Sequence, residues 1–167
     1  MNTDKVVQEI ELVVKMAISA WDSQNTRVDK LIDQLSDEQL LSEIASGKNR
    51  GVYLLGHLVA VNDNLIPLFG FGEKLYPQLG AVYLTNPDKS GLTESSVSEL
   101  KTYWKEVNAK LSQHFSKMQA AEWFTKHNSV SEEDFAKEPH RNKLNVLLNR
   151  TTHQSYHLGQ LVLLQRK

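Results

Sequence analysis

Apolar residues recur at three- and four-residue steps through residues 4–35, and this repeat constrains the fold more than any other feature of the chain. An α-helix with 3.6 residues per turn gathers residues at this spacing on one face. A long repeat close to 3.5 residues also favours packing in a bundle. The segment therefore predicts one long amphipathic helix. Its apolar face comprises Val7, Ile10, Val14, Ala17, Trp21, Val28, Leu31 and Leu35.

Three further segments predict helices, over about residues 50–69, 96–118 and 142–165. Pro67 should end or kink the second of them near the preceding residue, because proline lacks the backbone N–H of a helix interior. Ser96 followed by Glu99 is a capping box, which marks the beginning of the third helix.

The connections between these helices predict how they are arranged. Residues 70–92 contain four glycines and two prolines, so we expect a crossover with no long element. A connection of this length can carry the chain along a whole bundle, which makes the second and third helices parallel. We therefore expect an all-α fold, with residues 1–167 forming a single domain. The expected architecture is a four-helix bundle in up-down-down-up order.

Composition narrows the classes of function. The chain contains no cysteine, so it can offer neither disulfides nor thiolate ligands or nucleophiles. The net charge is −1 and no basic run occurs, which argues against a nucleic-acid partner. No stretch of about 18 apolar residues is evident, so we expect no membrane-spanning helix. The charged start, MNTDKVVQEI, lacks the apolar core of a signal peptide and predicts a cytoplasmic protein.

Two of the six histidines, His153 and His157, lie four residues apart in NRTTHQSYHLGQL. This spacing stacks both imidazoles on one side of a helix, one turn apart, as a shared metal ion requires. Many helices contain such a pair by chance, so the pair alone leaves metal binding and simple packing both open.

His57 provides a third imidazole at a matching depth. It lies about seven residues into its helix, roughly 10 Å at 1.5 Å per residue. In the expected topology His153 and His157 lie roughly 12–18 Å from the same end of the bundle. His57 also lies in YLLGHLVA, where we expect no other polar partner for a buried ring nitrogen. The three imidazoles are thus predicted to reach one level.

The remaining histidines have simpler interpretations. His114 continues the apolar face of the third helix and is expected to be a packed core residue. His127 and His140 lie in loop-like sequence, where we expect surface residues or contacts of a lid. The segment HNSVSEEDFAKEPH, within residues 120–141, is either such a lid over the metal pocket or a solvated charged surface.

Four other polar residues interrupt or border the predicted apolar faces. Gln24 and Asn25 interrupt the first apolar face, and they mark either an exposed bend or the polar wall of an internal cavity. Asn25, Asn62 and Asp63 are conceivable pocket residues, but the simpler expectation is that each faces solvent.

The motifs YLLGHLVAVND and THQSYHLGQL, about ninety residues apart, resemble those of the DinB/YfiT-like family of metal-dependent enzymes. LSDEQL, after the first predicted helix, and the length of the chain agree with the same family. The resemblance covers essentially the whole chain. It implies the up-down-down-up bundle that the connection lengths also predict.

The resemblance further implies that His57, His153 and His157 are metal ligands. The ion would be divalent, with nickel, zinc, iron and manganese all represented in the family, and the protein would be a homodimer. Some relatives transfer low-molecular-weight thiols such as bacillithiol or mycothiol, or use such a thiol to isomerise a substrate. The resemblance therefore implies a small-molecule substrate, and a low-molecular-weight thiol is one candidate.

Three neutral imidazoles leave open positions on an ion, which is typical of catalytic rather than structural sites. Gln160, one turn beyond His157, either orients that ligand as an outer partner or packs at the bundle edge. We therefore expect a metal-dependent enzyme, either a thiol-dependent transferase or a hydrolase. The alternatives are a non-catalytic metal-binding stress-response or ligand-binding protein, and three hydrogen-bonded core histidines without metal.

Overall fold

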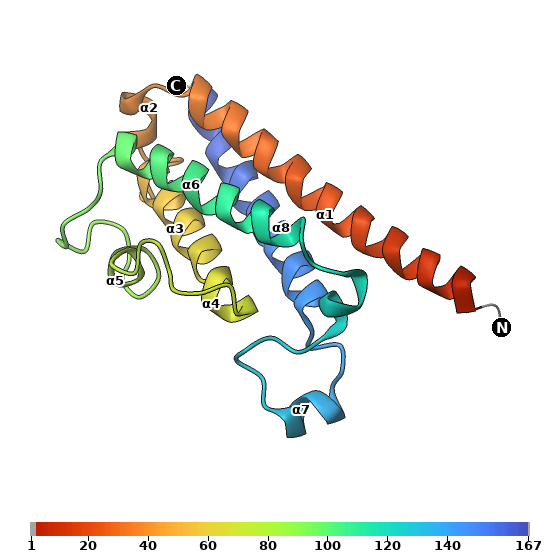
Figure 1. The fold of residues 1–167 in the computed structure, drawn as a ribbon. Helices are drawn as coiled ribbons and strands as arrows, with labels where there is room; N and C mark the ends of the chain where they lie inside the picture. The colour runs from red at the N-terminus through yellow and green to blue at the C-terminus, as the bar shows by residue number, and fades with distance from the viewer. Residues whose placement is uncertain (1–2, 167) are drawn as a thin grey trace.

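The computed structural model describes residues 3–166, and its regular structure is helical (Figure 1). The described residues contain no strand, only isolated bridges between Glu43 and Arg50 and between Lys126 and Asn142. The all-α prediction is confirmed. Four helices are long: α1 (Thr3–Gln34), α3 (Gly51–Asp63), α6 (Val97–Phe115) and α8 (Lys143–Leu161).

Six short elements connect or extend the long helices. They are α2 (Asp37–Leu41), α4 (Leu65–Phe69), α5 (Leu79–Tyr83), η1 (Ala120–Phe124), α7 (Glu132–Lys137) and η2 (Val162–Arg166). The capping box predicted at Ser96 and Glu99 is present at the start of α6. The crossover over residues 70–92 contains only the five-residue α5, as expected.

The second predicted helix is interrupted one turn earlier than expected. The sequence predicts a break next to Pro67, whereas α3 ends at Asp63 and α4 begins at Leu65. A proline lacks the N–H that would bond to the carbonyl four residues earlier, and its ring crowds that same carbonyl. For Pro67 that residue is Asp63, so the break lies where the missing bond would have been.

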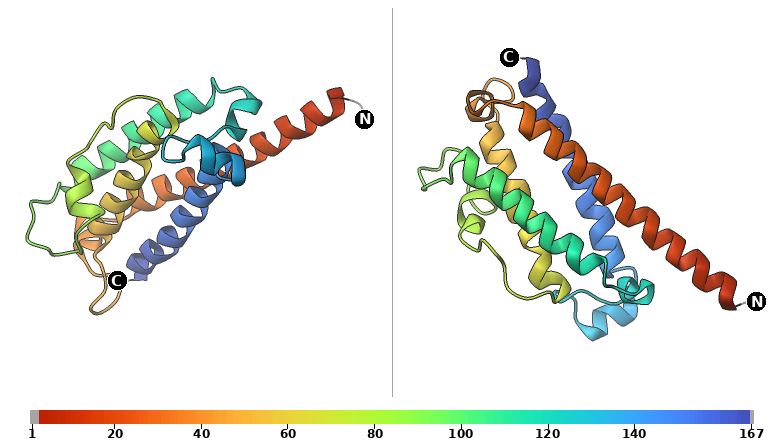
Figure 2. Two further views of the ribbon diagram at one scale, coloured as in Figure 1. Left: turned by 90° about the horizontal axis from the view of Figure 1, so that it is seen from below. Right: turned by 45° about the horizontal axis from the view of Figure 1, so that its top comes forward.

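The four long helices lie side by side, with α1 against α8, α3 against α6, and α3 also against α8 (Figures 1 and 2). α1 and α8 run toward the end of the molecule that carries α2, and α3 and α6 run away from it. At that end Gln39 Nε2 donates to the Leu164 carbonyl at 3.1 Å and so joins α2 to η2. Residues of α3 and α8 therefore face each other along antiparallel helices.

α3 is the central helix of the core, since eleven of its 13 residues are buried. The sequence predicts no segment long and apolar enough to span a membrane. By length and composition alone Gly51–Phe69 is such a segment, but 72% of its most apolar 18-residue stretch is buried inside the molecule. Such burial is typical of a core helix, because protein side chains already cover its apolar surface.

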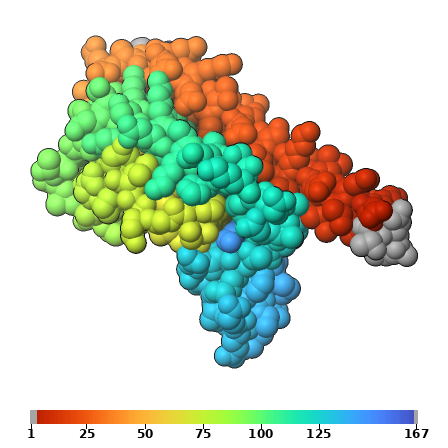
Figure 3. All heavy atoms as spheres, in the orientation of Figure 1, coloured from red at the N-terminus to blue at the C-terminus, as the bar shows by residue number. Residues whose placement is uncertain are grey.

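Two parts of the molecule extend from this core. The N-terminal part of α1 extends beyond the other helices, and the loop with α7 projects at the end away from α2 (Figures 1 and 3). Four apolar side chains on this part of α1 are about half exposed: Val7, Leu12, Val13 and Met16.

One amide side chain from each long helix meets inside the bundle, and we call these four residues the amide layer: Asn25, Asn62, Asn108 and Gln154. Asn62 Nδ2 donates to Asn108 Oδ1 at 2.9 Å and to Gln154 Oε1 at 3.4 Å. Gln154 Nε2 donates to Asn25 Oδ1 at 2.7 Å. The layer thus links all four long helices through polar contacts in the core.

The burial of three polar residues corrects three expectations. Asn25, Asn62 and Asp63 do not face solvent, because all three are buried. Asn25 instead lines a cavity of about 450 Å³ between α1 and α6. That cavity is open to solvent, so Asn25 forms a polar wall as one alternative proposed, but not the wall of an internal cavity. Asp63 accepts hydrogen bonds from the backbone N–H groups of Leu75 and Tyr76 at 2.8 and 2.9 Å, so it anchors the start of the crossover.

Candidate metal centre

Three histidine side chains converge between α3 and α8. The Nε2 atom of His153 lies 3.1 Å from Nε2 of His57 and 3.1 Å from Nε2 of His157. The prospective ligand atoms of the three residues all lie within 4.8 Å of one another, and all three side chains are half-buried. The structure therefore brings together the three imidazoles that the sequence predicts at one level, and we call them the histidine triad.

Two of these imidazoles are held by hydrogen bonds on their far side. Nδ1 of His57 lies 2.8 Å from the carbonyl oxygen of Tyr83, and Nδ1 of His157 lies 2.7 Å from Oε1 of Gln160. A carbonyl oxygen only accepts, so each Nδ1 carries the proton and donates it. In a neutral imidazole the Nε2 atom then holds a lone pair, which in both rings points toward His153.

His153 cannot satisfy both neighbours. Its Nδ1 atom is buried and has no hydrogen-bond partner. If its proton is on Nε2, it can serve only one of the two neighbouring lone pairs. If the proton is on Nδ1, three lone pairs face one another and a buried donor is unpaired, which is costly in a protein interior. A cation among the three Nε2 atoms would satisfy the three lone pairs, and the Nδ1–H of His153 would remain buried without a partner.

The electrostatics keep the rings in the form that binds metal. Burial, together with smaller contributions from the neighbouring His157, His57 and Arg150, lowers the pKa of His153 to about 4. Burial also lowers the pKa of His157, although its hydrogen bond to Gln160 opposes the shift. Because metal ligation needs neutral imidazole, these two rings are prepared for it at neutral pH.

The spacing of the nitrogens fits a single ion. Imidazole nitrogens bind zinc at about 2.0–2.1 Å, so two of them on a tetrahedral or octahedral ion lie roughly 2.9–3.4 Å apart. The two separations of 3.1 Å fall in this range. Three such ligands leave at least one position for water or another small molecule.

The expectation that nothing polar is available to His57 is wrong, because the Tyr83 carbonyl accepts from its Nδ1. Gly56 makes this contact possible. A Cβ atom at Gly56 would lie 2.4–2.6 Å from three atoms of the Tyr83 ring. That ring is buried, and its hydroxyl accepts a hydrogen bond from the Ser95 N–H at 3.1 Å. α5 therefore packs closely on α3 only because residue 56 has no side chain.

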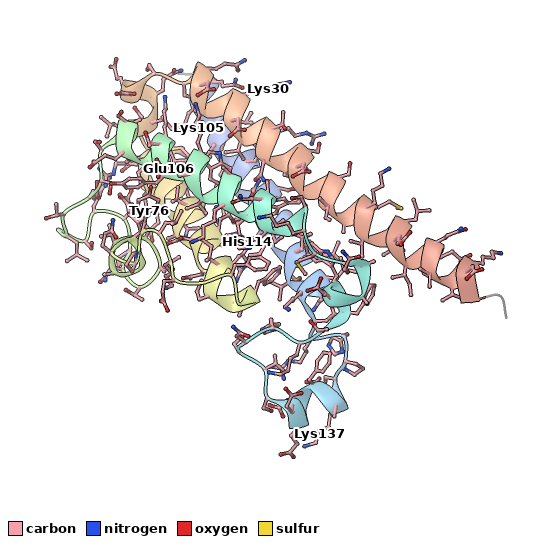
Figure 4. The ribbon with its side chains drawn as sticks, viewed as in Figure 1. Lys30, Tyr76, Lys105, Glu106, His114 and Lys137 are labelled. Atoms are coloured by element: carbon pink, nitrogen blue, oxygen red, sulfur yellow. The ribbon has the colours of Figure 1, made fainter. Side chains whose placement is uncertain are left out.

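The other histidines do not join the triad. His114 of α6 stacks on Phe71 with ring centroids 4.3 Å apart (Figure 4), so its expected packing role is confirmed, at a half-buried position. His127 contacts Ser129 through Nδ1, and His140 is exposed. These two lie in the loop that carries α7.

The structure does not support a lid formed by α7 over the triad. α7 projects from the end of the molecule where α8 begins, and Lys137 lies at its outer side (Figure 4). His153 lies ten residues beyond the first residue of α8, about 15 Å along the helix at 1.5 Å per residue. Within residues 3–166, no described hydrogen bond or ion pair joins α7 to the triad, and α7 has no buried residue.

The region that holds all three histidines matches a known protein family. The model of the DinB superfamily matches residues 20–161. A solved structure, described as the conserved protein of locus from Enterococcus faecalis, aligns with a TM-score of 0.63 at 14% sequence identity. The alignment covers 91% of this chain and 94% of the other, and at this identity it shows the fold alone. No curated protein matches the sequence.

Proposed function

The chain belongs to the DinB superfamily, and on this premise we propose that it is a metal-dependent enzyme. His57, His153 and His157 hold the divalent ion in this proposal. The observation that carries it is the meeting of three Nε2 atoms, two of which have their lone pairs fixed toward the third by hydrogen bonds at Nδ1. Histidines packed only for stability would direct these atoms to donors.

The proposed reaction is thiol-dependent group transfer or hydrolysis of a small molecule. A divalent ion bound by three imidazoles lowers the pKa of water or of a thiol in its open position. Because the chain has no cysteine, the thiol has to be an external low-molecular-weight compound. Imidazole ligands suit nickel, zinc and iron. Manganese is a further candidate because the family resemblance implies it.

The chain's own residues contribute orientation. The Tyr83 carbonyl and the Gln160 amide oxygen fix the tautomers of His57 and His157 and hold both rings toward one point. Such outer partners set the direction and basicity of metal ligands. Gln160 is itself held by donation from its Nε2 to the Tyr156 hydroxyl at 3.3 Å.

The proposal also includes the topology of the bundle, the location of the protein, its partners and its oligomeric state. We propose that α1, α3, α6 and α8 form an up-down-down-up four-helix bundle and that residues 1–167 are a single cytoplasmic domain. A small molecule is the proposed partner, with no role for nucleic acid or membrane. A homodimer is also proposed, and the exposed apolar residues on the N-terminal part of α1 support it.

Elemental analysis of the purified protein tests the proposal. We expect about one divalent ion per chain in the wild type and none in His57→Ala. His114→Ala is the matched control, because it removes a half-buried histidine outside the triad and should retain the ion. Absence of metal from the wild type, even after incubation with zinc or nickel, would contradict the proposal.

Turnover separates the enzyme from a non-catalytic metal-binding stress-response or ligand-binding protein. The metal-loaded protein is assayed with bacillithiol and glutathione as thiols, and with a panel of esters and amides. Turnover that disappears in His57→Ala would support the enzyme. Stoichiometric metal without any turnover would favour the non-catalytic alternative.

A further inference from the structure

Arg150 of α8 carries a charge that nothing in the described structure balances. Its side chain is half-buried, and its Nε atom is buried without a hydrogen-bond partner. Among residues 3–166, no carboxylate forms an ion pair with it. Burial accordingly lowers the pKa of its guanidinium group. A half-buried charge with a buried, unpaired N–H is costly, and an anion outside the chain would offset that cost.

Arg50 is a second half-buried arginine, and it has a structural role because carboxylates of the chain neutralise it. Its guanidinium contacts two carboxylates, Asp88 and Glu94, each at 2.5 Å. Its Nε also donates to Asp88 at 3.0 Å. The contrast with Arg150 is not a matter of exposure, since both side chains are half-buried. The difference is that Arg50 pairs with two carboxylates of the same chain, whereas Arg150 pairs with none among the described residues.

The Arg150 side chain lines a shallow cavity of about 470 Å³ that is open to solvent. Its lining is neutral apart from this arginine and consists of Asn64, Pro67, Leu68, Asn128, Ser129 and Arg150. The side chain of Asn64 has no hydrogen bond in the described structure. The cavity thus offers unpaired guanidinium and amide groups and no acid, which is the chemistry that recognises an oxyanion.

This cavity lies on the same seam between α3 and α8 as the histidine triad. Asn64 follows His57 by seven residues, and Arg150 precedes His157 by seven residues. Seven residues are two turns of a helix, so each pair shares a helix face, about 10 Å apart along the axis. Because α3 and α8 are antiparallel, both steps lead in the same direction, toward the end that carries α7. Along α8, His153 lies between Arg150 and His157, about one turn from each.

We propose that Arg150 binds an anionic group, a carboxylate or a phosphate, of the small molecule on which the metal centre acts. The inference rests on the proposed function and specifies its substrate class. The substrate carries an oxyanion at one end and its reacting group, a thiol or a scissile ester or amide, at the other. The two ends are separated by roughly 5–10 Å, the rise from Arg150 to His153 and to His157. Arg150 positions the molecule and takes no part in bond making.

Binding of inorganic phosphate to the full-length protein as purified tests this directly. Titration followed through the arginine Nε–H signals in ¹H–¹⁵N NMR spectra should shift the Arg150 signal and give a dissociation constant. R150Q is expected to raise that constant at least tenfold. R150K, which keeps the charge but loses the planar fork, should fall between the two. R27Q is the matched control, since Arg27 is an exposed arginine on α1, and it should bind phosphate as the wild type does.

The unfolding temperature of the same variants separates a ligand-binding arginine from a structural one. R150Q removes an unpaired half-buried charge, so its unfolding temperature should equal or exceed that of the wild type. Phosphate that binds R150Q as tightly as the wild type, through the metal or elsewhere, would overturn the inference. A lower unfolding temperature with unchanged phosphate affinity would overturn it as well.

Metal content measured on the same samples keeps the two proposals apart. R150Q should retain the ion of the wild type. The wild-type protein could lack metal and still bind phosphate in a way that R150Q abolishes. That result would support the anion site, and the missing metal would contradict the metal centre.

Discussion

The histidine triad and the amide layer are two polar clusters inside the same bundle, and they differ in how far their own groups can pair, although Nδ2 of Asn108 in the layer is itself buried without a partner. Both include residues of α3 and α8, and Gln154 of the layer directly follows His153 of the triad. In the layer, hydrogen bonds of 2.7–3.4 Å link four amides across four helices. In the triad, three ring nitrogens meet at distances that no arrangement of protons satisfies.

The chemical reason is the balance of donors and acceptors. Each side-chain amide carries both a donor and an acceptor, so neighbouring amides can pair. A neutral imidazole has one of each, and His57 and His157 use their donors on Tyr83 and Gln160. Only acceptors remain to face one another. A buried cluster of acceptors calls for a cation, whereas a buried cluster of amides holds helices together.

The largest expected effect on metal binding comes from breaking the triad at its middle member. His153→Ala should abolish metal binding and with it the stabilisation that added zinc gives. With zinc at 100 times its dissociation constant, that stabilisation is about 2.7 kcal/mol. Thermal unfolding with and without zinc measures it. An H153A protein that zinc stabilises as much as the wild type would rule out His153 as a ligand.

Breaking the amide layer should have the opposite signature. Asn62→Ala leaves the buried oxygens of Asn108 and Gln154 without their donor, at about 1–3 kcal/mol for each unsatisfied group. We expect a loss of roughly 2–6 kcal/mol in urea unfolding, nearer the lower end because the bond to Gln154 is long at 3.4 Å, with metal content unchanged. Asn149→Ala, at an exposed position of α8, is the control and should be neutral. Loss of metal in folded N62A would mean that the two clusters are not independent.

Gly56→Ala tests the support of His57. The added Cβ would meet the buried Tyr83 ring, which has little room to move. Overpacking of this kind costs about 1–3 kcal/mol, and displacement of the Tyr83 carbonyl should also weaken metal binding. Gly80→Ala is the matched control, because a Cβ there meets nothing within 4 Å. Calorimetric zinc titration and urea unfolding measure the two effects, and wild-type values in both would exclude the role of Gly56.

The smallest expected effect is that of Gln160→Ala. It removes the acceptor that holds His157 Nδ1, without touching a ligand atom. Loss of such an outer partner weakens metal binding by about 10- to 100-fold, while stability without metal should stay close to that of the wild type. Gln165→Ala, on η2, provides a control for the loss of a nearby exposed amide. Equal zinc affinity in Q160A and wild type would assign Gln160 to packing at the bundle edge.

Much of this arrangement could be predicted from the sequence because it depends on helical periodicity. The spacing of His153 and His157 fixes a common face. The depth of His57 along its own helix brings it to the same level once α3 and α8 are antiparallel. The long helices themselves follow from apolar repeats and from the capping box at Ser96 and Glu99.

The remaining features depend on contacts that leave no local pattern. Asn62 and Asp63 were expected to face solvent because they are polar, but α3 is buried on nearly every side and has no solvent face to offer them. The acceptor for His57 is a backbone carbonyl, which every residue has, in a crossover that shows no periodicity. Arg150 gave no signal either, since its lack of a partner becomes visible only when all neighbouring side chains are placed.

The most direct test of the metal centre is zinc titration of the protein followed by long-range ¹H–¹⁵N NMR spectra of the imidazoles. The Nε2 signals of His57, His153 and His157 should move together and saturate at one zinc per chain. The Nδ1 atoms of His57 and His157 should remain protonated, and the signals of His114 and His127 should not move. Saturation without any change at the three Nε2 atoms, or binding through Nδ1 of His57 or His157, would contradict the proposed metal centre.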